Sequence, residues 1–573
     1  MVQIELFKQL WKTCLRRLWL EEVIQGASEE TKTITISVNS SKLPLQEVES
    51  DLNDLQLSFK EKLQASLIEW AQTSNGFTFN IDDRQFHEQI YALLSNIALK
   101  PEIIEAVAIG FKNSDLTNLI ILFRRLEDFY RRWCDGEFID AAPNHNLPQK
   151  QMLQLQAQNV AIGLRKVDIN TGLNVMILLL ELHRFQEQIQ EQNLEAEITF
   201  YPSDKPDSDN FFTSRLLRVI NYSDSIEIGN FSNVVGAFLK GAQLKGVYLG
   251  DANLTGVNFS EANLSDAYLG DANLTGVQAK KVNLSNANLG DANLSGADLR
   301  EANLTHSDLT HCNLSGADLS GADLSGADLG DANLAGANLA GANLAGANLT
   351  SASLRDAILD GANLKNAILL GANLSDSSLI GVEMSYADLC RADLSGANLR
   401  GSTLKGTNLS DSILFSTNLT SAILLAADLS YAKLNGAKLQ QANLQQAIIL
   451  GADLGGVDLS QVILNEADLS GVTLSEADLS GANLSHAILL GTDLSYANLH
   501  HANLSGSNLS GAIFSGADLS YTDLSEAILG GADLSEANLE NMTWNENLEW
   551  ENVRGLDKAV NVPKTLKEKL NLF

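Results

Sequence analysis

The chain has 573 residues and a formal net charge of −32 at pH 7, a balance that argues against sequence-independent binding to nucleic-acid phosphates. Apolar residues make up 45% of the composition and aromatic residues only 6%, so the core must consist of aliphatic and small side chains. The four cysteines form no CxxC pair, and no run of 18 apolar residues occurs. We therefore expect a soluble, cytoplasmic protein without a structural metal, cofactor or membrane insertion.

Residues 1–225 predict a separate, mainly helical domain. Apolar residues recur at helical spacing in its longer segments, and the expected helices lie at 4–24, 48–67, 82–98, 116–133 and 172–190. Two short alternating segments, 33–38 and 196–201, predict a pair of strands, so the domain is expected to be α+β. The Pro- and Asp-rich segment 202–210 is typical of a linker, after which 211–219 leads into the repeats.

From Leu239 to Leu539 every fifth residue is apolar, without a slip in register. Leu occupies all but five of these 61 positions, the exceptions being Phe259, Ala279, Met384, Ile449 and Phe514. A small residue, usually Ala, stands two residues before each of them, so the unit reads A-(D/N)-L-x-x. Neither a helix nor a continuous strand keeps such positions on one face. The chain must therefore turn after each unit, with the small residue and the Leu pointing inward and the Asp or Asn outward.

A second period gives the number of units in a coil. The string LGDANL recurs at offsets that are multiples of 20, which predicts four pentapeptides per turn. About 15 coils and a rod of roughly 70 Å follow at ~4.8 Å per coil. The expected core includes Leu254, Leu274, Leu294, Leu314 and Leu334. An outward column should form an amide hydrogen-bond ladder, and its members are Asn253, Asn273, Asn293, Asn313 and Asn333.

Residues 237–541 resemble the pentapeptide-repeat family. The resemblance implies a right-handed quadrilateral β-helix with the central Leu and the small residue inside. It also implies a function class, since the best-understood members resemble DNA in shape and charge and bind DNA gyrase. The expected fold is thus mainly β, with a β-helix over 230–541 that follows the helical domain.

Residues 542–573 predict a cap for the end of the solenoid. Trp544, Leu548 and Trp550 break the register, and Pro563 opens a short amphipathic helix that carries Leu566. This helix is expected to close the solenoid.

The first candidate binding surface is acidic. From Leu439 to Val553 there is no Lys or Arg, against 16 Asp or Glu. Such a surface either captures a basic protein, imitates DNA, or only keeps an Ala- and Leu-rich repeat in solution. The outward Asp residues proposed for it are Asp453, Asp458, Asp468, Asp478, Asp493, Asp518, Asp523 and Asp533.

The second candidate surface is apolar. In several repeats Ile takes the usual Asp or Asn position, and four of these repeats are separated by multiples of 20, so their side chains should line one face. The candidate residues are Ile368, Leu370, Ile448, Leu450, Ile488, Leu490 and Ile528. This face would dock a protein partner or a second copy of the chain. The alternative is that these are ordinary exposed residues copied by a duplication.

Two smaller features each have two interpretations. Asp251, Asp271 and Asp291 lie at corners one coil apart and form either a divalent-ion site or a set of solvated turns. Two arginine pairs seven residues apart would hold an anion or an acidic partner, or they pair locally with Glu127 and Asp128. These arginines are Arg124, Arg125, Arg131 and Arg132.

Catalysis has little support, because no HExxH, GxSxG, P-loop or GxGxxG string is present. His306, His311, His500 and His501 are expected to be solvated corner residues, and Cys312 a core residue. The sequence favours a non-enzymatic interaction scaffold, which could form a homodimer. The alternatives are a DNA-mimicking regulator of DNA gyrase, a topoisomerase or another DNA-binding protein, and an enzyme within 1–225.

Overall fold

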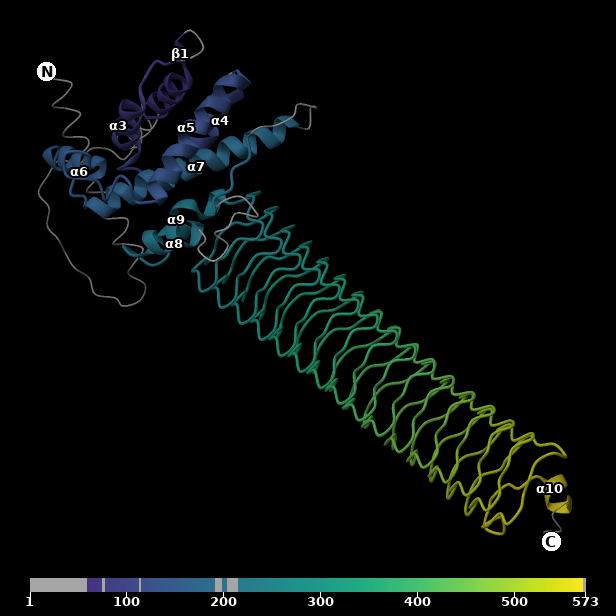
Figure 1. The fold of residues 1–573 in the computed structure, drawn as a ribbon. Coiled ribbons are helices and arrows are strands. Elements are labelled where there is room, and N and C mark those ends of the chain that lie inside the picture. Colours follow the sequence, from purple (N-terminus) through teal and green to yellow (C-terminus); the bar gives the residue numbers. More distant parts are fainter. Residues whose placement is uncertain (1–58, 75–77, 113–114, 191–197, 204–214, 570–573) are drawn as a thin grey trace, which may run out of the picture. The chain divides into compact units, whose positions relative to one another are not determined.

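The computed structural model describes residues 59–74, 78–112, 115–190, 198–203 and 215–569 (Figure 1). The chain divides into two compact units, one within Met1–Leu93 and Leu99–Arg125, the other comprising Leu94–Ala98 and Leu126–Phe573. The helix expected at 4–24 and the strand at 33–38 lie outside the described residues.

The first unit is helical, as expected, with a short hairpin that the sequence did not predict. A helix over 59–71 leads into strands β1 (Thr73–Ser74) and β2 (Thr78–Phe79), which pair antiparallel. The helices α3 (Asp83–Leu94), α4 (Pro101–Lys112) and the first part of α5 (Leu116–Cys134) complete it. The sequence pattern missed α4 because its segment PEIIEAVAIGFK contains apolar residues on most of its circumference.

Arg125 is buried in the first unit. Its guanidinium donates to the carbonyl oxygens of Trp70 and Ile81, both at 3.0 Å, and contacts Asp83 Oδ1 at 3.3 Å. Burial lowers the pKa of Arg125, and the nearby Asp83 only partly opposes this. The side chain thus joins three segments of the unit by hydrogen bonds.

Before the solenoid, the second unit contains the end of α5, α6 (Leu147–Ala157), α7 (Leu164–Gln190), α8 (Arg215–Asp224) and α9 (Asn230–Val235), followed by the 3₁₀ turn η1 (Gly236–Phe238). The buried carboxylate of Asp168 on α7 accepts hydrogen bonds from Trp133 Nε1 and Tyr222 Oη, both at 3.1 Å. Three helices distant in sequence, α5, α7 and α8, are therefore held at one point.

One strand prediction is wrong in the part that the structure describes. Residues 198–201 belong to no strand. The carbonyl oxygen of Ile198 lies 3.3 Å from His183 Nδ1. The ring of Phe200 packs edge-on against the ring of Tyr130, with 5.4 Å between the ring centroids. The alternation of apolar residues thus reflects packing against helices rather than a sheet.

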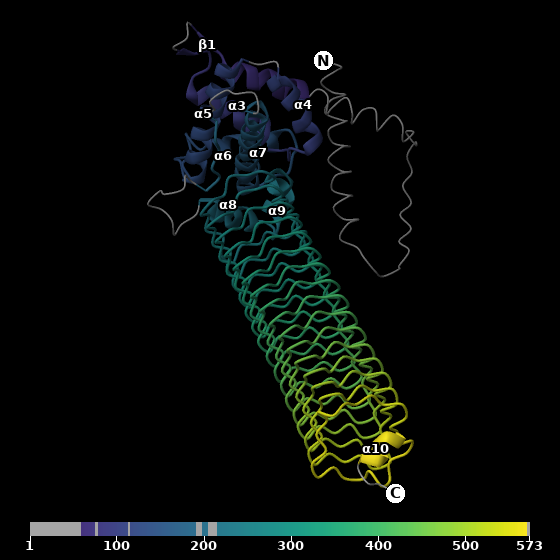
Figure 2. The same ribbon diagram turned by 90° about the vertical axis from the view of Figure 1, so that its right-hand side faces the viewer.

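The segment expected to lead into the repeats is helical from Arg215, because Leu216, Val219 and Ile220 form a buried helical stripe. Beyond it, α9 lies at the start of the solenoid (Figure 2), and the Gly236 carbonyl of η1 accepts from the Asn258 amide at 3.0 Å. Ser232 Oγ donates to the Asn253 carbonyl at 3.3 Å, and Arg184 of α7 donates to the Phe238 carbonyl at 2.9 Å. These bonds satisfy main-chain groups that the first coil would otherwise expose.

In the solenoid, parallel β-bridges join residues 20 apart, beginning with Gln243 and Asn263, so four pentapeptides complete each coil (Figure 1). The amide of Leu244 donates to the Asn263 carbonyl at 2.8 Å, and this pattern recurs coil after coil. Each bridge is isolated, because the chain turns after every unit. The inward positions from Leu239 to Leu539 are almost fully buried, among them the five proposed core leucines at 254, 274, 294, 314 and 334.

The amide ladder forms over part of the expected column. Asn313 Nδ2 donates to Asn293 Oδ1 at 3.2 Å, and Asn333 Nδ2 donates to Asn313 Oδ1 at 3.3 Å. Nearer the start, the Oδ1 atoms of Asn253 and Asn273 accept from the threonine hydroxyls of their own turns.

One stretch of the main-chain ladder is looser than the rest. The Leu434 amide donates to the Asp453 carbonyl at 3.3 Å, and the Asp453 amide donates to the Ala432 carbonyl at 3.4 Å. The equivalent bond from the Leu294 amide to the Asn313 carbonyl is 2.7 Å long. Within these described coils, the amides of Gly436, Gly451 and Asp458 donate to no main-chain carbonyl. Core residues from Leu429 to Leu464 line a cavity of about 10 Å³ at this level. The coils are therefore less tightly joined here.

At the C-terminal end β-bridges continue, but the number of residues between bridge partners increases. Bridges join Asp523 to Thr543 and Asn538 to Val560, separations of 20 and 22 residues. Helix α10 (Lys564–Lys569) follows and buries Leu566 completely.

Candidate interaction surfaces of the solenoid

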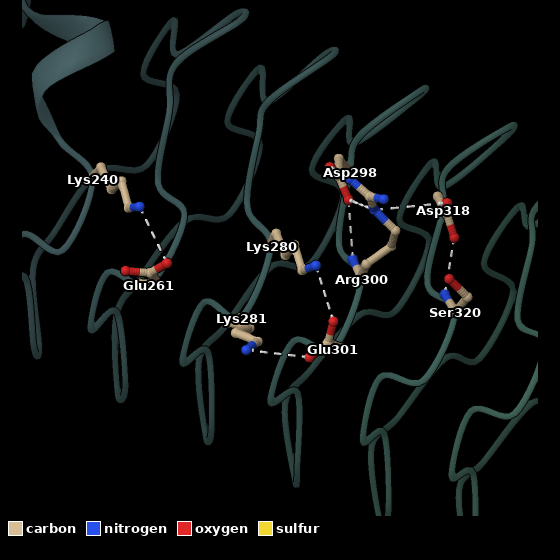
Figure 3. A network of polar contacts seen from close by, with 9 residues as sticks. All are labelled: Lys240, Glu261, Lys280, Lys281, Asp298, Arg300, Glu301, Asp318 and Ser320. Atoms are coloured by element: carbon tan, nitrogen blue, oxygen red, sulfur yellow. Dashed lines mark hydrogen bonds and ion pairs between the residues drawn. The ribbon is translucent and has the colours of Figure 1, made fainter.

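The corner at which the coils begin carries ion pairs that run from one coil to the next (Figure 3). Lys240 Nζ lies 3.2 Å from Glu261 and Lys280 Nζ 3.1 Å from Glu301, each pair 21 residues apart. Lys281 also contacts Glu301, at 3.4 Å. We call these five residues the paired corner. Its charges have partners within the chain, so they add little net attraction for a ligand.

An arginine extends this arrangement to the next coil (Figure 3). Arg300 Nη2 lies 2.6 Å from Asp298 Oδ2, and Arg300 Nε lies 4.0 Å from Asp318. The hydrogen bond from Arg300 lowers the pKa of Asp298. Basic and acidic side chains are thus interleaved in the first coils.

The last third differs in charge, and we call residues 439–553, which lack Lys and Arg, the acidic segment. All eight proposed Asp residues there accept a hydrogen bond from the backbone amide two residues later, with distances of 2.9–3.1 Å. For Asp458, burial raises the pKa, but hydrogen bonds from Ser460 and Gln440 outweigh it and the pKa is lowered. One oxygen of each carboxylate therefore stabilises its own turn.

These aspartates do not gather on one side of the solenoid. Their positions in the 20-residue coil place Asp523 on one face, Asp468 on a second, and three residues on each of the other two. The three on one of these faces are Asp453, Asp493 and Asp533, and the three on the other are Asp458, Asp478 and Asp518. The negative charge therefore surrounds the rod.

The proposed apolar residues share one face, because the four Ile are separated by multiples of 20. Ile448 is 47% exposed, whereas Ile528 is half-buried. The bridges join Ile448 to Asp468, Asp468 to Ile488, and Ile488 to Asn508. Apolar and polar coils thus alternate, and Ile368 lies four coils before Ile448. The face is a series of separate apolar patches rather than a continuous stripe.

The pattern of repeats matches a known family model. The model for Pentapeptide repeats (8 copies) matches a series of segments from 230–260 to 512–543, which together cover more than half of the 573 residues. The chain belongs to the pentapeptide-repeat family. The resemblance drawn from the sequence is thereby confirmed, as are the β-helix solenoid and the helical N-terminal region.

Solved pentapeptide-repeat structures resemble parts of the chain. HetL from the cyanobacterium Nostoc sp. PCC 7120, described as involved in heterocyst differentiation regulation, is 32% identical; the match covers 44% of this chain and 89% of HetL, with a TM-score of 0.15. Trypsin-treated QnrB1, a plasmid-mediated fluoroquinolone resistance protein, is 22% identical; the match covers 37% of this chain and 93% of QnrB1, with a TM-score of 0.25. A search of curated proteins returned no match.

The remaining candidates in this pentapeptide-repeat protein are less suited to binding. Asp251, Asp271 and Asp291 are exposed corner residues with φ of 59°. Among the described residues, no group of three or more His, Cys, Asp or Glu is placed to hold a metal ion. Cys312 is fully buried, and burial raises its pKa. The rings of His500 and His501 contact each other at 4.3 Å.

The arginines also have local roles. Arg131 pairs with Glu127 at 3.0 Å and Arg132 with Asp128 at 3.7 Å, which confirms the local pairing for these two arginines. Arg125 is buried and hydrogen-bonded inside the first unit, so the prediction that it contributes to a surface anion site is wrong.

The first unit contains a cavity of about 240 Å³ between the helix over 59–71, α4 and α5. Its lining is mostly apolar, and Asp115 is its single titratable residue. This is not the convergent set of titratable groups that an active site requires. Within the described residues, no helix is long and apolar enough to cross a membrane.

Sequence reasoning missed one feature beside the apolar patches. In five successive coils the corner next to them is glycine, at positions 451, 471, 491, 511 and 531. The same corner in earlier coils carries side chains such as Asp271 and Tyr431. The recurrence of Gly at 20-residue spacing was the available signal.

Proposed function

We propose that the protein is a non-enzymatic scaffold that binds protein partners along its pentapeptide-repeat solenoid. The observation that carries this proposal is the face of Ile448, Ile488 and Ile528 within the acidic segment. Large aliphatic side chains stand there in place of the Asp and Asn that fill the same position in neighbouring coils. An apolar surface with an acidic surround suits a protein partner that carries apolar and basic side chains.

The main-chain ladder supports a scaffold role, because repeated bonds between coils hold exposed side chains at fixed spacing. The proposal includes a β-helix of about 15 coils over 230–541, a helical domain over 1–225 with a linker at 202–210, and a C-terminal cap over 542–573 closed by a short helix. It places the protein in the cytoplasm, without direct nucleic-acid binding. A second copy of the chain is the other binding partner to test for this face, and it would form a homodimer.

A DNA-mimicking regulator of DNA gyrase or another DNA-binding protein is the alternative. The absence of Lys and Arg over 439–553 favours it. The binding of one oxygen of each proposed aspartate to its own turn instead favours a structural role for these side chains. A supercoiling assay with the full-length protein distinguishes the two functions: inhibition of gyrase supports mimicry.

The scaffold proposal is tested by affinity purification of the full-length protein, followed by mass spectrometry. A triple variant, Ile448→Asn, Ile488→Asn and Ile528→Asn, should lose the proteins that the wild type recovers. Asn occupies this position in other coils, so the ladder should remain intact.

The matched control is Ile358→Asn, Ile463→Asn and Ile513→Asn, which makes the same change on the three other faces. This control should recover the wild-type partners. Equal recovery by both triple variants would contradict the proposal. Sedimentation of the same proteins tests whether the face instead joins two copies.

A further inference from the structure

The apolar face of the acidic segment repeats every two coils. We define the Ile face as residues 446–450, 466–470, 486–490, 506–510 and 526–530. Ile448 and Leu450 project from the first of these coils and Ile488 and Leu490 from the third, all about 40% exposed or more. The second coil instead presents Glu466 and Asp468, and the fourth presents Asn508. The apolar patches are thus separated by polar, mainly acidic side chains.

A column of glycines, which have no side chains, runs along one side of this face. We call Gly451, Gly471, Gly491, Gly511 and Gly531 the glycine edge. Their φ values lie between 63° and 72°, and a Cβ built on Gly471, Gly491 or Gly531 would meet no atom within 4 Å. At these three corners no side chain covers the backbone, and a partner can approach it closely, whereas the ring of Tyr431 lies over Gly451.

The charge around the Ile face has one sign. Asp468 lies between Ile448 and Ile488 on the face, while Asp453 and Asp493 stand on the neighbouring face beyond the glycine edge. Asp468 uses Oδ1 to accept from the Ser470 amide and hydroxyl. No Lys or Arg occurs over 439–553 to neutralise these groups. A partner must therefore bring cations between its apolar contacts.

The main chain of Ile448 and Ile488 has no bonds left for an added strand. The Ile488 amide donates to the Ala467 carbonyl at 2.9 Å, and the Ile488 carbonyl accepts from the Leu469 amide at 2.7 Å. Ile448 is bonded in the same way to Ala427 and Leu429. A bound segment must thus satisfy its own backbone, which an α-helix does.

The spacing also fits a helix. Two coils rise about 9.6 Å at ~4.8 Å per coil. Seven residues of an α-helix rise about 10.5 Å. We propose that the Ile face binds a basic amphipathic α-helix that has an apolar residue at every seventh position and Lys or Arg three or four residues after it. This inference rests on the proposed scaffold function and names the class of partner.

The probe is a synthetic peptide of three heptads with Leu at every seventh position, Lys four residues later and Ala or Gln elsewhere. Its binding to the full-length protein is measured by fluorescence anisotropy at low ionic strength. One control peptide has the same composition but leucines spread around the helix, and a second replaces Leu by Ala. The first peptide should bind at least tenfold more tightly than either control.

Variants of the protein locate the binding. The double change Ile448→Asn and Ile488→Asn should weaken binding of the probe at least tenfold, whereas Ile463→Asn, the same change on the adjacent face, should alter it less than twofold. Gly491→Tyr should also weaken it, because a ring would cover the glycine edge. The fold tolerates such a ring: Tyr431 at this corner lies over Gly451, 2.7 Å from the position of an added Cβ.

Equal binding of the probe and the control peptides, or unchanged binding by the Ile448 and Ile488 variant, would overturn the proposal. If the purification still depends on the Ile face while the probe does not bind, the partner is not a helix of this kind and the scaffold proposal stands. If neither depends on the face, both proposals fail.

Discussion

The first coils and the acidic segment have the same kind of interior but differ in surface charge. Leu299 and Leu489 are both fully buried, and both donate their amides to a carbonyl of the next coil at 2.7–2.8 Å. In the first coils, Lys240 and Lys280 pair with carboxylates 21 residues later. In the acidic segment, the proposed aspartates bond to their own turns. The comparison shows that interior positions set the fold while faces and corners vary without affecting it.

Truncating a core leucine should have the largest effect on stability. The loss should be smaller in the coils whose main-chain bonds are longer. Leu299→Ala should lower the free energy of unfolding by about 3–5 kcal/mol, because a close-packed interior leaves a cavity. Leu439→Ala should cost less, about 2–3 kcal/mol, since Leu439 already lines a small cavity and its surroundings can relax. Urea unfolding followed by circular dichroism measures both. Equal losses would show that the looser bonds do not matter.

The next effect concerns local opening. The amides of Gly436, Gly451 and Asp458 should exchange with deuterium at least tenfold faster than that of Gly256, which donates to the Thr275 carbonyl at 3.0 Å. Exchange resolved by mass spectrometry compares the peptides. Uniform protection along the solenoid would contradict a weaker junction at the start of the acidic segment.

Added salt should destabilise the first coils and stabilise the acidic segment. Raising NaCl from about 50 to 500 mM screens the attraction at the paired corner and the repulsion among carboxylates in the acidic segment. Exchange should therefore become slightly faster near Lys280 and slower near Asp478. The same direction in both regions would indicate that salt acts through the common interior.

The smallest effect should follow from Glu301→Gln. A hydrogen bond from Lys280, with help from Lys281, lowers the pKa of Glu301. Because the pKa is lowered in the folded state, this carboxylate stabilises the protein above its unfolded pKa of about 4.3, and the contribution is lost as the pH falls through the folded value. Thermal unfolding should show a slightly lower midpoint for the variant at pH 7, and this difference should shrink as the pH falls below the unfolded pKa. Glu536→Gln, in the acidic segment, is the control and should not lower the midpoint at pH 7.

The helical regions were harder to predict than the repeats. The helix expected at 172–190 begins earlier, at Leu164, and the one expected at 82–98 ends at Leu94. Helix α6 was missed because its segment LPQKQMLQLQA has no clear apolar stripe. The packing of these helices depends on contacts such as that of Asp168 with Trp133 and Tyr222, and no local pattern predicts contacts across such sequence distances.

The sequence by itself determined the solenoid, because each five-residue unit specifies its own turn and its own inward residues, and the 20-residue recurrence specifies the coil. It also placed Ile368, Ile448, Ile488 and Ile528 on one face, and it left residues 439–553 without Lys or Arg. Only the tertiary structure decided which side chains contact or cover one another: that no side chain lies over Gly471, Gly491 or Gly531, that Asp168 joins Trp133 and Tyr222, and that Arg125 is buried. The physical reason is that the repeat is a local property of the chain, whereas a surface is made by neighbours that are distant in sequence.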